Sequence, residues 1–126
     1  MKQATKAQLR RRFLDRRRAL TDGQVAAASA RIVSRAVSFL ESAHPEAVCA
    51  YVGVHGEVDT RGLLDACRSR GCRLFLPRYV AEERTYRFAE FDARGLVPGP
   101  MQIPQPAGAA PANIPRTVSL VFVPGV

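Results

Sequence analysis

The chain has 126 residues, 47% of them hydrophobic, and a net charge of +8. This length suits a single domain over residues 1–126, with a core of its own, and is too short for two. No apolar run approaches the roughly 20 residues that cross a bilayer, and neither a CxxC pair nor zinc-type histidine spacing is present. We therefore expect a cytoplasmic protein without a membrane partner, a disulfide framework or a structural zinc.

The positive charge is concentrated at the N-terminus. Residues 1–18 hold eight of the 19 Lys and Arg residues and one of the 11 acidic residues. Residues 3–20 lack Pro and Gly, and Leu9, Phe13 and Leu20 fall on roughly one face. This pattern predicts a basic amphipathic helix with a narrow apolar stripe.

Lys2, Lys6 and Arg10 are spaced four residues apart in that helix. Their side chains would lie along one side of it and converge on a polyanion such as a triphosphate. A basic helix is also typical of a solvated face or of a nucleic-acid contact, so a basic nucleic-acid-binding α/β protein stays an alternative. Aromatic residues make up only 7% of the chain and Trp is absent, so few side chains could stack on nucleic-acid bases. This composition favours a protein with no nucleic-acid partner.

A second helix is predicted over residues 22–43. Thr21 and Gln24 have the Thr-x-x-Gln spacing of a capping box, and apolar residues follow at helical spacing. His44 precedes Pro45 and should end the helix, because the residue before a proline is disfavoured in the helical region.

Residues 47–76 have the pattern of a strand, a helix and a second strand. The first strand is an apolar run that ends at Gly53, and either Asp59 or Thr60 can cap the helix that follows. Gly71 lies where a left-handed residue would end that helix. The segment therefore predicts a βαβ unit with two parallel strands.

The rest of the chain predicts two strands separated by a long loop. Residues 85–91 alternate as a half-exposed strand does, and residues 92–116 carry six of the nine prolines. Residues 118–123 form a continuous apolar strand. The expected fold is α/β, with a mostly parallel sheet flanked by helices in three Rossmann-like layers. We expect it to be incomplete at the C-terminus, because the loop that usually binds the ligand after such a strand would lie beyond residue 126.

Several side chains near the expected strand ends are candidates for ligand contacts. Glu57 can accept hydrogen bonds from a ring edge with adjacent N–H donors, or it can join Asp59 in favouring the N-terminus of the next helix. His55 is a possible base but suits an exposed loop histidine better. Arg78 could neutralise a phosphate or a glutamyl carboxylate, and Tyr79 could stack on a ligand or pack in the fold.

Five short motifs occur in order along the chain. They are Lys6-Ala7-Gln8-Leu9-Arg10, Tyr51-Val52 with Gly56-Glu57-Val58-Asp59-Thr60, Leu76-Pro77-Arg78-Tyr79, Ile103-Pro104-Gln105-Pro106, and Val121-Phe122-Val123-Pro124-Gly125-Val126. Together they make the chain resemble the 5-formyltetrahydrofolate cyclo-ligase family, also called methenyltetrahydrofolate synthetase. Each motif is weak alone, but their order and spacing are jointly specific.

The resemblance implies an enzyme that closes 5-formyltetrahydrofolate to 5,10-methenyltetrahydrofolate with ATP and Mg²⁺ and releases ADP and phosphate. It assigns ATP contacts to Lys6, Ala7, Gln8, Leu9 and Arg10, substrate contacts to Val52 and Glu57, and no catalytic side chain. A monomer that binds folate and ATP is the expected state.

Relatives carry a Gly-rich loop after the motif that ends at Val126, and the resemblance assigns phosphate and metal binding to that loop. The metal ligands are therefore expected beyond residue 126, and the 126 residues alone are expected to be inactive. A degenerate folate-binding protein without catalysis is the remaining alternative.

Overall fold

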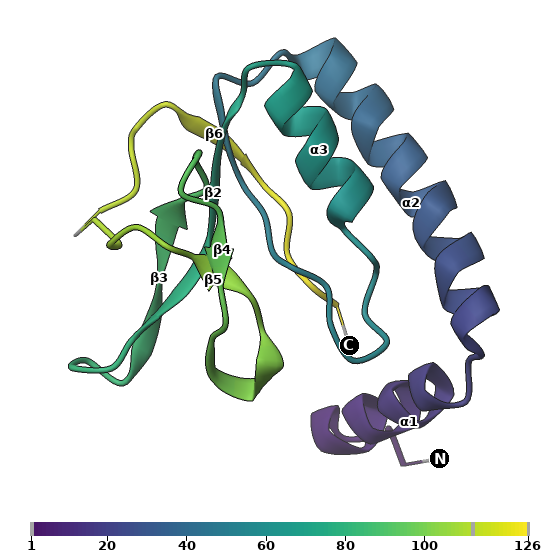
Figure 1. Ribbon diagram of the computed structural model, residues 1–126. Coiled ribbons are helices and arrows are strands. Elements are labelled where there is room, and N and C mark those ends of the chain that lie inside the picture. Colours follow the sequence, from purple (N-terminus) through teal and green to yellow (C-terminus); the bar gives the residue numbers. More distant parts are fainter. Residues whose placement is uncertain (1, 112, 126) are drawn as a thin grey trace.

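The computed structural model describes residues 2–111 and 113–125, so Met1, Ala112 and Val126, the last residue of the final motif, lie outside the described residues. Three helices and a four-stranded sheet make up most of the structure (Figure 1). In chain order the elements are α1 (Lys6–Arg18), α2 (Asp22–Ala43), β1 (Ala47–Cys49), α3 (Arg61–Ser69), β2 (Arg73–Val80), β3 (Thr85–Glu90), β4 (Leu96–Val97), the short 3-10 helix η1 (Pro100–Gln102), β5 (Gln105–Pro106) and β6 (Val118–Val121).

The main sheet has the strand order β3-β2-β1-β6. β1 pairs in parallel with both β2 and β6, and β2 pairs antiparallel with β3. The predicted α/β class with a mostly parallel sheet is therefore confirmed, and so is the parallel pairing predicted for the βαβ segment. Both parallel neighbours of β1 end on the same side of the molecule as β1 itself, which creates a shared carboxyl edge.

Helices α2 and α3 lie together on one side of the sheet (Figure 1). Their apolar faces meet β1 and β2 in a core cluster that comprises Leu40, Val48, Ala50, Leu63, Leu64, Cys67, Leu74 and Leu76. A smaller cluster of Ala47, Cys49 and Phe75 forms elsewhere in the sheet, with Phe88 and Val118 packed against it. The described residues thus supply a helical layer and a sheet, two of the three expected layers.

Capping residues set the helix bounds. α1 begins at Lys6, three residues later than predicted, because Thr5 is its N-cap and forms a capping box with Gln8. α2 has the predicted bounds, and the predicted capping box between Thr21 and Gln24 is present. His44 ends α2 in the left-handed conformation, with φ of 45°.

The Pro-rich segment 92–116 is more regular than predicted. It contains β4 and β5, which pair antiparallel, and the turn η1 between them. Two residues of β2 hold β5 by hydrogen bonds. The backbone N–H of Tyr79 donates to Gln105 Oε1 at 3.0 Å, and Arg78 donates to the carbonyl oxygen of Pro106. β2 extends four residues beyond its predicted end at 76. In this extension β1 is no longer its neighbour, and the Gln105 side chain accepts from the β2 backbone instead.

The strand ends differ slightly elsewhere. β1 stops at Cys49 instead of Gly53, β3 ends one residue before the predicted 91, and β6 stops at Val121 instead of Val123. Gly71 has φ of 72°, so its predicted left-handed role is confirmed. None of the helices in the described ranges is both long and apolar enough to cross a membrane.

Candidate functional site

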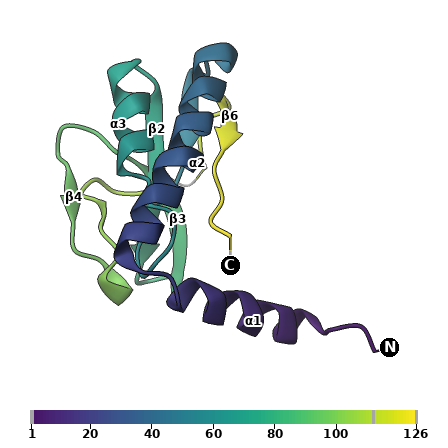
Figure 2. The same ribbon diagram turned by 90° about the vertical axis from the view of Figure 1, so that its right-hand side faces the viewer.

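Helix α1 lies beyond the carboxyl edge of the parallel strands. Figure 1 shows it below the loop that follows β1, and Figure 2 shows its N-terminal end extending away from the sheet. In open α/β sheets this edge is where ligands bind. A pocket of about 370 Å³ opens there between α1, α2 and the loop after β1. Its lining residues are Phe13, Arg16, Arg17, Leu20, Val25, Ala28, Ser29, Ile32, Tyr51, Gly56, Glu57, Val58 and Gly125.

One face of α1 forms the first wall of this pocket. Phe13, Arg16 and Arg17 are spaced at i, i+3 and i+4, so they share a side of the helix, and Leu20 follows just after the helix ends. The guanidinium carbon of Arg16 lies 5.6 Å from the centre of the Phe13 ring, within cation–π range. No residue of α1 is buried, and Phe13 and Leu20 are each 45% exposed. This wall therefore presents apolar and cationic groups that are exposed, except for the half-buried Arg17.

The loop after β1 forms the second wall and requires glycine at its start. A Cβ on Gly53 would lie 1.8 Å from the carbonyl oxygen of Val58, so only glycine allows the two ends of the loop to meet. The side chain of Thr60, at the end of the loop, is hydrogen-bonded to the backbone at its start. Its buried hydroxyl accepts from the N–H of Gly53 at 3.1 Å and donates to the carbonyl oxygen of Tyr51 at 2.7 Å.

The tip of the loop orients Glu57. His55 and Gly56 are both left-handed, with φ of 53° and 81°, and they turn the chain so that Glu57 N–H donates to the Val54 carbonyl oxygen at 3.1 Å. Glu57 Oε1 in turn accepts from the N–H of Val54 at 3.0 Å. In the described part of the chain no hydrogen bond or ion pair reaches Glu57 Oε2. The carboxylate is thus fixed by one oxygen and has the other available.

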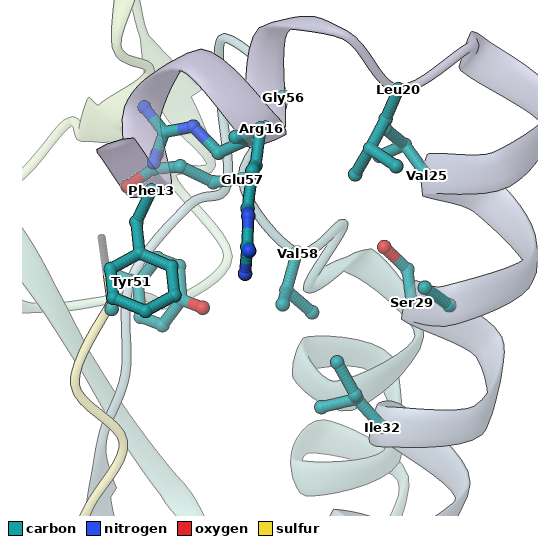
Figure 3. A pocket seen from close by; sticks show the side chains of 13 residues that line it. Phe13, Arg16, Leu20, Val25, Ser29, Ile32, Tyr51, Gly56, Glu57 and Val58 are labelled. Atoms are coloured by element: carbon teal, nitrogen blue, oxygen red, sulfur yellow. The ribbon is translucent and has the colours of Figure 1, made fainter. Parts of the chain in front are cut away.

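Tyr51 stands beside this carboxylate. Burial raises the pKa of the Tyr51 phenol, and the negative charge of Glu57 raises it further. The phenol accordingly keeps its proton and remains a hydrogen-bond donor over the whole physiological range. Figure 3 shows Phe13, Tyr51 and Glu57 on one side of the pocket, with Val25, Ser29 and Ile32 of α2 on the other.

Ser29 ties the second wall to α2. Its hydroxyl accepts from the N–H of Asp59 at 2.8 Å, and the side chain is 4% exposed. The sequence carries no signal for this contact, because the burial of Ser29, which makes a partner necessary for its hydroxyl, is known only from the structure. Of the two predicted caps, Thr60 occupies the N-cap position of α3 but makes no side-chain cap, and Asp59 Oδ1 accepts from the N–H of Arg61 at 3.1 Å.

The sequence-predicted ATP residues occupy the first two turns of α1. Lys6, Ala7, Gln8, Leu9 and Arg10 are all exposed and do not line the pocket. The Gln8 side chain is already engaged in the capping box with Thr5. Of the two predicted substrate residues, Glu57 lines the pocket, whereas the half-buried side chain of Val52 packs against the core of α2, α3 and the sheet.

The remaining candidates have partners within the fold. His55 Nε2 donates to the carbonyl oxygen of Met101 at 3.0 Å, Arg78 is bound to Pro106, and the Tyr79 ring packs edge-on against Tyr86 with centroids 5.3 Å apart. Cys49 and Cys67 are fully buried, and burial raises the pKa of both thiols, that of Cys67 to about 11. These thiols stay protonated and have no nucleophilic character.

The described residues do not gather a metal site. Nowhere in residues 2–111 and 113–125 do three or more His, Cys, Asp or Glu side chains come together in a way that could hold a metal ion.

The pocket suits a ligand with three chemical features. Its apolar surfaces would cover the faces of a flat ring, Glu57 Oε2 would accept from N–H donors on the ring edge, and the two guanidinium groups would receive an anionic oxygen. The described lining residues supply hydrogen-bonding and charged groups that can bind and orient reactants.

Solved structures with a similar fold include two 5,10-methenyltetrahydrofolate synthetases. The NMR structure of Aquifex aeolicus 5,10-methenyltetrahydrofolate synthetase has a TM-score of 0.72 at 22% identity and covers 94% of this chain and 59% of that chain. A 5,10-methenyltetrahydrofolate synthetase from Mycoplasma pneumoniae has a TM-score of 0.58 at 18% identity and covers 73% of this chain and 56% of that one. This chain thus spans less than two thirds of the length of either neighbour.

No curated protein matches the chain. A family model, however, matches almost all of it, over residues 2–126, and its description is the 5-formyltetrahydrofolate cyclo-ligase family. The match agrees with the order of the five sequence motifs and with an α/β fold that places a carboxylate beside a basic helix. The chain belongs to the 5-formyltetrahydrofolate cyclo-ligase family.

Proposed function

We propose that the pocket between α1 and the loop after β1 binds 5-formyltetrahydrofolate. The observation that carries this proposal is Glu57, whose carboxylate is fixed through Oε1 and has Oε2 available on the wall of an otherwise mostly apolar pocket. The pyrimidine half of a reduced pterin is a flat ring with adjacent N–H donors on one edge, which match this wall. Family membership and the neighbouring solved structures support the same ligand class.

The proposed reaction is ATP-dependent closure of 5-formyltetrahydrofolate to 5,10-methenyltetrahydrofolate. The formamide oxygen is a poor leaving group, so transfer of the γ-phosphoryl group to it, with loss of ADP, prepares the formyl carbon for attack by N10. Phosphate then leaves as the ring closes. Such a step depends on positioning two reactants and neutralising charge, which suits a site built from a fixed carboxylate and a basic helix.

ATP is proposed to approach along the exposed side of α1. Lys6 and Arg10 lie one turn apart in the first half of that helix and have no ion-pair partner in the described residues. Mg²⁺ is proposed as the second cofactor, with its ligands beyond residue 126, since the described residues hold no group of three or more His, Cys, Asp or Glu side chains that could bind a metal ion. Residues 1–126 by themselves are expected to bind ATP weakly and to show no turnover, as the sequence resemblance implies.

Binding of 5-formyltetrahydrofolate tests the folate site. Titration calorimetry of the protein should give a measurable dissociation constant, and Glu57→Gln should weaken it about tenfold or more, because an N–H donor replaces an acceptor oxygen. Glu82→Gln removes an exposed carboxylate far along the chain in the turn before β3 and should leave the affinity unchanged. Equal affinity for the wild type and Glu57→Gln would reject this site.

Turnover tests the rest of the proposal. Formation of the methenyl product is followed by its absorbance, with a full-length family member as the positive control. Binding of the folate without product formation is the result expected for residues 1–126, and it would also fit a degenerate folate-binding protein. Product formation by residues 1–126 would show that the expectation of inactivity is wrong.

A further inference from the structure

Arg17 lies in the α1 wall of the pocket with a buried and unpaired nitrogen. Its Nε is shielded from solvent and has no hydrogen-bond partner among the described residues. The stem of the side chain passes over the loop tip, since a Cβ on Gly56 would lie 3.6 Å from Arg17 Cγ. A buried N–H without an acceptor is rare in folded proteins because it gives up its hydrogen bonds to water without replacement.

The neighbouring charged groups do not supply the missing partner. Glu57 lines the same pocket, but no ion pair joins it to Arg17, and its Oε1 accepts from Val54. Arg16 lies over the ring of Phe13. The described part of the pocket thus holds an acid and a guanidinium that do not neutralise each other. An ion pair between them would remove both from ligand binding, so their separation leaves each one open to a different part of the ligand.

We infer that Arg17 is a substrate-contacting residue of the proposed reaction, and that its guanidinium donates to an anionic oxygen of the bound ligand while Glu57 holds the ring edge. This inference rests on the proposed function of the pocket. The anionic oxygen has two possible sources with the same chemistry, the glutamyl carboxylate of the folate and a phosphoryl oxygen of ATP. A planar guanidinium can bind either one through two parallel hydrogen bonds.

The position of Arg17 distinguishes it from the cationic residues in the first half of α1. Lys6 and Arg10 are exposed and lie outside the pocket lining, so they can act on a ligand only from its outer side. Arg17 is half-buried and lies against the same loop that orients Glu57. A single ligand can therefore contact both side chains, and the pairing of a donor with an acceptor would fix its orientation.

The variant Arg17→Met tests the inference in the full chain. Methionine keeps an unbranched stem over Gly56 and removes the unpaired N–H, so the melting temperature of the ligand-free protein should not fall. Calorimetry should show a dissociation constant about tenfold to a hundredfold higher for at least one ligand, as expected when a charge-assisted hydrogen bond is lost. The matched control is Arg12→Gln, which removes the same charge from an exposed position of α1 outside the pocket.

The two ligands separate the two sources of the anionic oxygen. Weaker binding of 5-formyltetrahydrofolate alone identifies the glutamyl carboxylate, and weaker binding of ATP alone identifies a phosphoryl oxygen. Unchanged affinity for both ligands in Arg17→Met overturns the inference while the proposed function stands. An equal loss in Arg12→Gln, or a clear fall in the melting temperature of ligand-free Arg17→Met, also overturns it, because the role would then be general charge or packing. A wild-type protein that binds neither ligand contradicts the proposed function itself and, with it, this inference.

Discussion

The two walls of the pocket are held in different ways. The loop after β1 is fixed by the close approach at Gly53, by both hydrogen bonds of the Thr60 hydroxyl and by the contact of Asp59 with Ser29. Helix α1 has no buried residue. A rigid wall that carries the carboxylate thus faces a loosely packed wall that carries the cations. If the pocket binds the proposed folate, the loop should set which ligand fits and α1 should complete the site when the ligand is present.

Gly53→Ala should cause the largest loss of stability, because it adds a Cβ at the closest backbone contact of the rigid wall. The added Cβ would overlap the carbonyl oxygen of Val58, so the backbone must move, and we expect a loss of about 3 kcal/mol in the free energy of unfolding. Urea denaturation measures it. Gly23→Ala is the control, since a Cβ there meets only the Thr21 hydroxyl at 4.0 Å. If both variants are equally stable, the loop is not constrained as described.

Thr60→Val should have the next largest effect. Valine fills the same space but leaves the N–H of Gly53 and the carbonyl oxygen of Tyr51 without partners, at a cost of about 2 kcal/mol. Thr60→Ser keeps the hydroxyl and should recover most of the stability. Thermal unfolding of both variants checks the difference, and a serine variant as unstable as the valine variant would assign the effect to lost packing instead.

Phe13→Ala sharpens the comparison from the other wall. The ring is 45% exposed in the ligand-free protein, so its removal should change the free energy of unfolding by less than about 1 kcal/mol. Affinity for 5-formyltetrahydrofolate should fall about fivefold to tenfold, because the ring is expected to cover the ligand. Denaturation and calorimetry on the same sample separate the two effects. A large loss of stability would show that α1 is packed as firmly as the loop.

Acid should weaken the rigid wall slightly through Asp59. Hydrogen bonds from Arg61 hold the pKa of this carboxyl below its ordinary value. A lowered folded-state pKa contributes stability that is present above the unfolded-state value and lost as the pH falls through the folded-state value. Between neutral pH and strong acid the wild type should therefore lose more stability than Asp59→Asn, by under about 1 kcal/mol because the pair is largely exposed. Urea midpoints at several pH values measure this, and identical pH profiles would contradict it.

The sequence predicted the parts of the fold that depend on neighbouring residues. The capping box at Thr21, the left-handed Gly71 and the parallel pairing of β1 with β2 all follow from local pattern and short connections, and all are present. The regular structure in the Pro-rich segment depends on Gln105 reaching Tyr79, residues far apart in the chain. A composition rich in proline cannot reveal such a partner.

The site was predicted in part for the same reason. Glu57 follows a strand and precedes a helix, so its place at the carboxyl edge could be inferred from chain order alone. The apolar stripe formed by Phe13 and Leu20 is visible in the sequence. Its position beside Glu57 depends on how the chain turns between α1 and α2, which the sequence pattern does not determine. The role of Ser29 could be recognised only from its hydrogen bond with the N–H of Asp59 in the structure, because the sequence does not show which group a helical serine contacts.

Hydrogen exchange with and without 5-formyltetrahydrofolate tests most directly whether the ligand binds between a rigid wall and a loosely packed one. The hydrogen-bonded amides of Gly53, Val54, Glu57 and Asp59 should already exchange slowly in the free protein and change little. Amides in the second half of α1, from Phe13 to Arg18, should slow markedly when the ligand binds. Slowing confined to regions away from α1, with this helix unchanged, would contradict the account.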